Sequence, residues 1–193
     1  FSFTLHTPNL TQSIILPLAG IHNVHNALAA AAATLQAGAS IDDVARGLAN
    51  ARNVAGRLRT VRLAMGATLY DDSYNANPDS VAAAINAMEG VEGETLLVLG
   101  DMGELGPDGP ELHASIGRLA RESGALQLYC AGELSRATVD AFGDGAHWFS
   151  SLEELCAAVR PELVPGRNVL VKASRFMGLD QVVQALSAAG EEA

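Results

Sequence analysis

The sequence predicts an α/β fold in which a mostly parallel sheet is covered by helices on both faces. Two observations indicate this class. Short apolar runs alternate with helical patterns along most of the chain, and polar residues cluster where an apolar run gives way to a helix. With 193 residues, 49% of them hydrophobic and 18% charged, the chain can form one large domain or a small one plus part of another.

The first part of the chain is expected to form a smaller unit. The elements expected in it are strands at residues 3–5 and 13–18 and helices at residues 23–35 and 41–50. Ser40 followed by Asp43 fits a capping box, which predicts the start of the second helix. A connector with glycine and arginine follows at residues 53–59. We place the domain boundary there, which gives domains at residues 1–56 and 57–193.

Beyond the connector, strands and helices are expected to alternate. The expected strands are residues 58–63, 67–70, 95–99, 126–130, 147–149 and 168–171. The expected helices are residues 78–88, 110–123, 135–142, 152–159 and 177–189. Asn77 is a favourable N-cap and Pro78 suits a first helical position, so the first of these helices has a well-defined start. Such alternation implies parallel strands joined by crossover helices.

The composition excludes some classes of partner. The net charge of −10 argues against nucleic acid and anionic membranes, which need a basic surface, but it leaves room for a local phosphate site. No apolar stretch is long enough to span a membrane, and no signal peptide is recognisable. Because the chain starts at Phe1 rather than Met and enters a strand at once, we expect it to begin inside a domain.

The two cysteines indicate a compartment. Cys130 and Cys156 lie far apart without CxxC spacing, and both have apolar neighbours. We therefore expect two buried free thiols in a reducing, cytoplasmic setting.

The most informative segment is Y-D-D-S-Y-N-A-N-P-D-S, which follows an expected strand and opens an expected helix. Ligands of α/β proteins bind outside the carboxyl ends of strands, near helix N-termini, so a binding site is indicated here. Asp72 can accept hydrogen bonds from ribose hydroxyls. Asp71 can do the same or merely end the strand. Ser73 and Asn77 can belong to the site or can merely serve the turn and the cap.

Two further candidates precede this loop. Asn23 and Asn26 share a helix face, and an amide that offers a donor beside an acceptor suits the edge of a purine. The alternative is that Asn23 only caps its helix. Arg57 in the connector can clamp a phosphate with two hydrogen bonds, or it can be a solvated arginine.

A glycine-rich loop, V-L-G-D-M-G-E-L-G-P, follows the strand expected at residues 95–99. Asp101 and Glu104 in it can meet an amine or a metal, or serve the turn. His113 can reach back to the loop or lie on the surface. The loop lacks the G-x-G-x-x-G pattern, and the chain contains no G-x-x-x-x-G-K-[ST], so neither a dinucleotide fingerprint nor a P-loop is present.

The segment Lys172-Ala173-Ser174-Arg175 ends the last expected strand. It contains the only lysine of the chain. Placed at the expected start of the last helix, these residues predict a site for an anion or a carboxylate. A plain helix start is the alternative.

The order of these motifs resembles the Mur ligase family. From Gly20 to the last helix the chain carries G-x-H-N-x-x-N-A-L-A-A-A, G-R, D-D-S-Y-N-A-N-P, L-G-D-M-G-E-L-G-P and V-K-A-S-R. The D-D-S-Y-N-A-N-P and L-G-D-M-G-E-L-G strings are specific, whereas H-N-x-x-N is also found in folylpolyglutamate synthases. Within the family, the likeness is greatest to members that join D-alanyl-D-alanine to UDP-N-acetylmuramoyl-tripeptide.

The resemblance implies the end of a central ATPase domain followed by a whole Rossmann-like carboxyl-terminal domain. It implies that Asn23 and Asn26 lie by the adenine, that Arg57 contacts an ATP phosphate, and that Asp72 holds the ribose. The residues that it places, more loosely, near the acceptor D-alanyl-D-alanine are Asp101, Glu104, Lys172, Ser174 and Arg175.

The reaction implied is ATP-driven amide formation through an acyl phosphate, in the last cytoplasmic step of peptidoglycan precursor synthesis. ATP and Mg²⁺ are the implied cofactors, and a monomer is expected. The family's P-loop, magnesium ligands and modified lysine precede the residues seen here. No catalytic or metal-ligating residue is therefore expected in this chain, and it is expected to be inactive alone. Ala173 stands where the family form K-G-S-R has glycine, a mild departure.

Two other functions compete with this one. The first is a nucleotide-binding or partner-binding module that keeps the fold without catalysis. The second is a related ligase with another acceptor, such as a folate-glutamylating enzyme, which the D-M-G-E-L-G loop disfavours.

Overall fold

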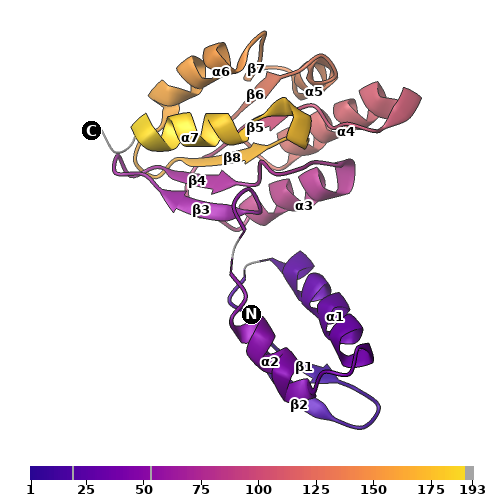
Figure 1. Ribbon diagram of the computed structural model, residues 1–193. Coiled ribbons are helices and arrows are strands. Elements are labelled where there is room, and N and C mark those ends of the chain that lie inside the picture. Colours follow the sequence, from indigo (N-terminus) through magenta and orange to yellow (C-terminus); the bar gives the residue numbers. More distant parts are fainter. Residues whose placement is uncertain (19, 53, 190–193) are drawn as a thin grey trace. The chain divides into compact units, whose positions relative to one another are not determined.

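The computed structural model of this protein describes residues 1–18, 20–52 and 54–189. It contains two compact units, Phe1–Asn53 and Val54–Ala193 (Figure 1), and each is described by itself. Residues 54–56, expected in the first domain, lie in the second unit, because Gly56 is hydrogen-bonded to Asp71 there.

The first unit packs two helices on a two-stranded antiparallel sheet. Its elements are β1 (Ser2–His6), β2 (Thr11–Ile15), α1 (Ile21–Gln36) and α2 (Ile41–Ala49). The small core between them is formed by Leu5, Ile14, Ala31 and Val44. The predicted capping box is confirmed, since the Ser40 hydroxyl accepts from the Asp43 N–H while the Asp43 carboxylate accepts from the Ser40 N–H.

The second unit is built on a six-stranded sheet. Its strands are β3 (Arg59–Arg62), β4 (Thr68–Asp71), β5 (Thr95–Gly100), β6 (Gln127–Ala131), β7 (Ala146–Phe149) and β8 (Asn168–Lys172). Their spatial order is β3-β4-β8-β5-β6-β7, and only the β3–β4 pair is antiparallel. The predicted mostly parallel sheet is thereby confirmed. The order also makes β4, β8 and β5 neighbours although β8 comes last in the chain.

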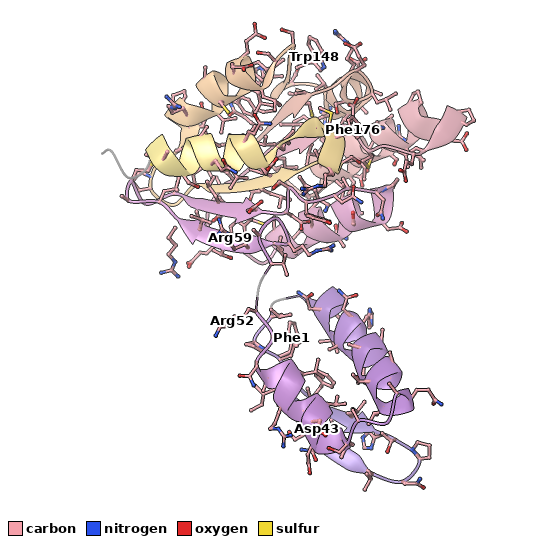
Figure 2. The ribbon with its side chains drawn as sticks, in the orientation of Figure 1. Phe1, Asp43, Arg52, Arg59, Trp148 and Phe176 are labelled. Carbon is pink, nitrogen blue, oxygen red and sulfur yellow. The ribbon has the colours of Figure 1, made fainter. Side chains whose placement is uncertain are left out.

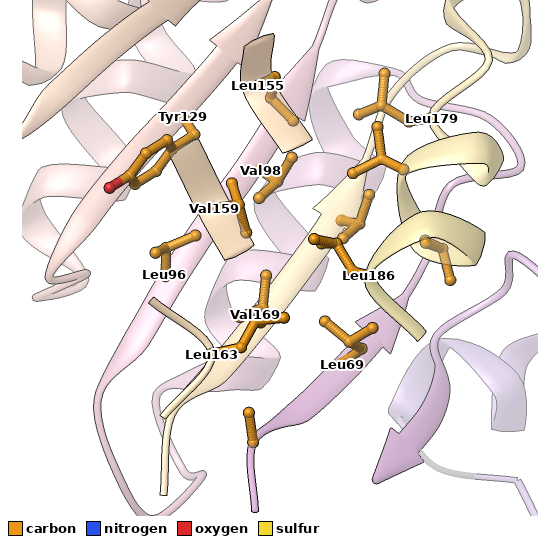
Figure 3. Close-up of a cluster of buried hydrophobic side chains, with 14 of the residues drawn as sticks. Leu69, Leu96, Val98, Tyr129, Leu155, Val159, Leu163, Val169, Leu179 and Leu186 are labelled. Carbon is orange, nitrogen blue, oxygen red and sulfur yellow. The ribbon is translucent and has the colours of Figure 1, made fainter. Parts of the chain in front are cut away.

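Helices cover both faces of this sheet (Figure 1). The helices are α3 (Pro78–Met88), α4 (Gly109–Glu122), α5 (Ser135–Phe142), α6 (Leu152–Val159) and α7 (Asp180–Ala189), and the 3-10 turns are η1 (Gly106–Asp108), η2 (Arg160–Glu162) and η3 (Arg175–Met177). Leu96 and Val98 pack with α6 and α7 in the cluster drawn in Figure 3, and Leu97 and Leu99 pack with α3, α4 and α5. Consecutive side chains of β5 thus enter opposite cores, as expected of a central parallel strand.

Two predicted boundaries differ from the structure by three residues. The last helix starts at Asp180 rather than at residue 177, because η3 comes first and Gly178 then adopts a left-handed conformation with φ 66°. The Lys172–Arg175 segment therefore leads into a 3-10 turn and not directly into a helix. β2 ends at Ile15, before Pro17, whereas it was expected to continue to residue 18. No helix among the described residues is long and apolar enough to cross a bilayer.

Both cysteines are free thiols, and they differ in burial. Cys130 is fully buried on β6, as predicted, whereas Cys156 on α6 is only half-buried. Burial raises the pKa of the Cys130 thiol far above its ordinary value, and the negative charge of Asp101 raises this pKa further. Burial also raises the pKa of Cys156.

We predict that the two thiols react at very different rates. Because the thiolate is the attacking species, a disulfide reagent at pH 8 should modify Cys156 slowly and Cys130 not at all in the native protein. Both should react in 8 M urea, and Cys156→Ser should leave no reactive thiol before unfolding. Equal native rates for the two thiols would contradict this assignment.

Candidate functional site

The second unit has a hollow where three neighbouring strands end. The loops after β4, β5 and β8 line it and enclose about 690 Å³. The residues that line this strand-end hollow are Tyr74, Asn75, Ala76, Asn77, Gly103, Glu104, Leu105, Ser174, Arg175 and Phe176. The motifs that the sequence separates by about a hundred residues therefore meet in one place. This is the edge at which ligands of parallel α/β sheets bind.

The connector before β3 is held against the loop after β4. The Gly56 N–H donates to Asp71 Oδ2 at 3.0 Å, and the Leu58 N–H donates to Asp72 Oδ1 at 3.0 Å. The Tyr74 N–H donates in turn to the Gly56 carbonyl at 3.0 Å. Gly56 has φ 74°, and a Cβ there would lie 2.9 Å from the Tyr74 nitrogen, so only glycine allows this close approach.

The adjacent carboxylates Asp71 and Asp72 have different surroundings. Asp71 is buried and accepts from the Ser73 hydroxyl at 2.6 Å. Asp72 receives the Lys172 ammonium group at 2.6 Å, and its side chain is 17% exposed. Asp72 is thus the one of the pair that lies nearer to solvent, at the position where ribose binding is expected.

Lys172 is engaged within the protein. Its side chain is only 4% exposed, and Nζ donates to Asp72 Oδ2 and, at 2.9 Å, to the Asn75 carbonyl. Sequence reasoning placed this lysine at the acceptor. The structure instead gives its charge a partner inside the protein and makes it a link between β8 and the loop after β4.

Ser174, which follows β8, links the loops that follow β4 and β5. Its hydroxyl accepts from the Gly103 N–H at 2.8 Å and donates to the Ala76 carbonyl at 3.1 Å. Its N–H donates to the Asp101 carbonyl at 3.0 Å. Ser174 is buried, so one side chain joins the segments that follow β4, β5 and β8.

Asp101 is turned toward α5 and is also buried. Its carboxylate accepts from the Ser135 N–H at 2.8 Å, from the Ser135 hydroxyl at 2.7 Å and from the Leu134 N–H at 3.2 Å. An anion at the first turn of a helix satisfies N–H groups that have no helical partner. A Cβ at Gly132 would overlap this carboxylate. Asp101 therefore holds α5 and is not among the residues that line the hollow.

His113 does reach back from α4 to the glycine-rich loop. It is 1% exposed, its Nε2 accepts from the Met102 N–H at 2.9 Å, and its Nδ1 lies 2.7 Å from the Gly109 carbonyl. A carbonyl can only accept, so this pattern assigns the proton to Nδ1 and makes the ring neutral. His113 thereby fixes the backbone just before Gly103.

The exposed charges of the hollow are Glu104 and Arg175. Glu104 has φ 62°, a left-handed conformation that is uncommon for a residue with a side chain. The guanidinium carbon of Arg175 lies 4.9 Å from the centre of the Tyr74 ring, and that of Arg57 lies 4.6 Å from the same centre. Among the described residues, no ion pair joins either arginine to a carboxylate.

Asn23 and Asn26 belong to the other unit, on the first turns of α1. The N-cap of α1 is Gly20, so Asn23 lies inside the helix and is not its cap. Asn26 is exposed and Asn23 is partly buried. The structure keeps these two residues on one helix and brings the remaining candidates together in the second unit.

Sequence reasoning missed some residues of the hollow. Tyr74 and Asn75 were part of the loop singled out, but neither received a role. Phe176, which is 69% exposed beyond β8 (Figure 2), was not singled out at all. A signal was available for Phe176, because a large apolar residue next to a polar cluster at a strand end is typical of a ligand site. Across residues 1–18, 20–52 and 54–189, no three histidine, cysteine or acidic side chains are grouped as metal ligands.

We predict that the Ser174 hydroxyl stabilises the fold of the second unit. Ser174→Ala leaves the partly buried Gly103 N–H and the buried Ala76 carbonyl without this partner, so the free energy of unfolding should fall by about 1–3 kcal/mol. Urea denaturation measures this change. Ser187→Ala is a matched control, because the buried Ser187 hydroxyl has no hydrogen-bond partner among the described residues, and it should cost nothing.

A second prediction concerns the Lys172–Asp72 ion pair. Lys172→Met leaves a largely buried carboxylate unpaired and should lower the free energy of unfolding by about 3 kcal/mol. Adding Asp72→Asn should recover part of this loss, with a coupling of about 0.5–3 kcal/mol in the double-mutant cycle. Arg118→Met, which breaks an exposed pair with Glu111, is the control and should cost at most about 1 kcal/mol. Additive effects at Lys172 and Asp72 would refute the coupling.

Comparison with known proteins identifies relatives of this chain. Residues 56–175 match the family described as "Mur ligase, glutamate ligase domain". The chain is 39% identical over 190 residues to UDP-N-acetylmuramoyl-tripeptide–D-alanyl-D-alanine ligase of Escherichia coli, and 32% identical over 184 residues to that of Bacillus subtilis. These alignments cover 97% and 92% of this chain but only 42% and 40% of the relatives.

Solved structures give the same result. A crystal structure of MurF from Acinetobacter baumannii superposes with a TM-score of 0.85 at 32% identity, covering 97% of this chain and 42% of that one. MurF from Thermotoga maritima, in complex with ADP, shares the fold with a TM-score of 0.79 at 22% identity, covering 94% and 42% of the two chains. The chain spans about two fifths of the length of these relatives, and it belongs to the Mur ligase family.

Proposed function

We propose that this chain is the carboxyl-terminal part of an ATP-dependent amide ligase of the cytoplasm. The ligase adds D-alanyl-D-alanine to UDP-N-acetylmuramoyl-tripeptide, as the names of its E. coli and B. subtilis relatives state for those proteins. The observation that carries the proposal is the strand-end hollow, where the specific motifs of three loops meet beside exposed charges of both signs. Such a site suits a small zwitterion.

The acceptor dipeptide has one ammonium group and one carboxylate. We assign the carboxylate to Arg175, whose planar guanidinium group can bind it with two hydrogen bonds. We assign the ammonium group to Glu104, the exposed acid that lines the hollow. The volume of about 690 Å³ lies in the range of small-molecule pockets, and Phe176 offers an apolar surface for a methyl group.

The other three residues expected near the acceptor receive a different role. Lys172, Ser174 and Asp101 are buried, and the side chain of each makes hydrogen bonds within the protein. We propose that they position the loops that carry Glu104 and Arg175 and do not contact the dipeptide.

The nucleotide is assigned to the residues that the resemblance to the family indicated for it. Asn23 and Asn26 would hold the adenine, Asp72 the ribose, and Arg57 a phosphate. The exposed guanidinium group of Arg57 suits a phosphate, and Asp72 Oδ1, which accepts one backbone hydrogen bond, retains capacity for a hydroxyl donor. The P-loop and magnesium ligands would come from the part of the ligase that precedes these residues, as the resemblance to the family implies.

The residues of the hollow would act by orientation and charge. ATP supplies the phosphoryl group that activates the tripeptide carboxylate as an acyl phosphate. Glu104 and Arg175 would hold the dipeptide so that its amine faces the carbonyl carbon of the acyl phosphate. Arg57 would neutralise the negative charge of the phosphate that is released. Positioning of this kind can supply a large part of the rate enhancement of a two-substrate reaction.

The decisive experiment measures phosphate release by the complete polypeptide that carries this chain. With ATP, Mg²⁺ and UDP-N-acetylmuramoyl-tripeptide, we expect steady release only when D-alanyl-D-alanine is also present. Arg175→Gln should raise KM for the dipeptide at least about tenfold, as expected for the loss of a charged hydrogen bond. Arg118→Gln, on the outer surface of α4, is the matched control and should change nothing.

Two results would contradict the proposal. Absence of release from the folded polypeptide under every combination would favour a module that binds nucleotide or partner without catalysis. Release that requires glutamate and a folate instead of the two proposed substrates would favour the ligase with another acceptor.

A further inference from the structure

Two arginines from distant parts of the chain share one aromatic ring. Arg57 precedes β3 and Arg175 begins η3, yet both guanidinium carbons lie within 5 Å of the centre of the Tyr74 ring, at 4.6 and 4.9 Å. The two charges are consequently within roughly 10 Å of each other, about one Debye length at 0.1 M salt. Tyr74 is 39% exposed at the edge of the strand-end hollow.

The backbone around this ring is fixed on each side. The Tyr74 N–H donates to Gly56, the residue before Arg57, and the Arg57 N–H donates to the Val54 carbonyl at 3.1 Å. Arg175 follows Ser174, whose hydroxyl is bonded to the Ala76 carbonyl two residues beyond Tyr74. Each arginine therefore starts from a backbone position tied to the Tyr74 loop, and the ring is the surface on which both side chains lie.

An aromatic partner holds a guanidinium group differently from a carboxylate. The negative face of the ring attracts the cation by about 0.5–1 kcal/mol at an exposed site, and it leaves the full positive charge and the N–H donors for a ligand. Two like charges held together in this way repel each other. An anion that binds to one arginine lowers that repulsion and so favours the extended, ring-stacked position of the other.

We propose that Tyr74 is a positioning residue that holds Arg57 and Arg175 together at the mouth of the hollow. Its ring then couples the arginine assigned to the nucleotide phosphate with the arginine assigned to the acceptor carboxylate, so the two ligands assist each other's binding. This assignment of roles rests on the proposed function, whereas the shared ring is a property of the chain itself.

Kinetics of the complete ligase test the coupling. Tyr74→Leu should raise KM for both ATP and the dipeptide by about 2–5-fold, the loss of one cation–π contact for each arginine. It should also abolish the dependence of one ligand's apparent affinity on the other's concentration. Tyr74→Phe keeps the ring and should restore both properties. If Tyr74 only stabilised the fold, Tyr74→Leu would lower the yield of active enzyme, and with it the apparent kcat, but it would leave both KM values unchanged.

Arg136→Gln is the matched control, because Arg136 lies 3.5 Å from the centre of the Trp148 ring and makes the same kind of contact away from the hollow. It should leave both KM values unchanged. If Tyr74→Leu behaves like Arg136→Gln, or if Tyr74→Phe fails to restore the coupling, the proposal is wrong.

A measurement on the 193-residue chain keeps the inference separate from the ligase assignment. The side-chain Nε–H signals of Arg57 and Arg175 should be displaced by the ring current of Tyr74, and Tyr74→Leu should move both signals. Arg175→Gln should in addition shift the Arg57 signal. If the complete polypeptide shows no ligation but these shifts appear, the proposed function fails and the shared ring stands. If neither signal responds to Tyr74→Leu, the shared ring is refuted whatever the enzyme does.

Discussion

The contact on which the rest of the site depends is the one made by the buried Lys172 ammonium group. An unpaired charge is costly to bury, so this group requires acceptors, and it finds them in the Asp72 carboxylate and the Asn75 carbonyl. Both acceptors lie in the loop after β4, so the end of β8 is tied to that loop. Asp71, at the end of β4, and Asp72, in this loop, then hold the connector, and the loop presents Tyr74 to the hollow.

Most of the second unit's architecture could be predicted, because its signals are local. The N-cap Asn77 with Pro78 fixes the start of α3, and apolar runs bounded by turn residues mark the strands. The start of α7 could not be predicted in this way. Apolar periodicity continues through Phe176 and Met177, and only the left-handed conformation of Gly178 separates η3 from the helix.

The site could be located but not resolved into roles. The strand-to-helix loops indicated the edge of the sheet at which the hollow lies, because chain order and fold class determine where parallel strands end. The partners of Lys172, Ser174 and Asp101 lie 33 to 100 residues away, and no local pattern encodes such pairs. Sequence reasoning therefore treated these three as ligand contacts, whereas their partners within the protein are the basis on which we propose a supporting role for them.

The hydrogen bonds from residues 56 and 58 to the two aspartates have a mechanical consequence. They join the connector to the second unit, so Arg57 belongs to the same compact unit as Tyr74 and Arg175 although it comes before β3. The backbone positions of these three residues are therefore set within one unit. The spacing of the two guanidinium groups depends on the connector's hydrogen bonds and on the ring that they share.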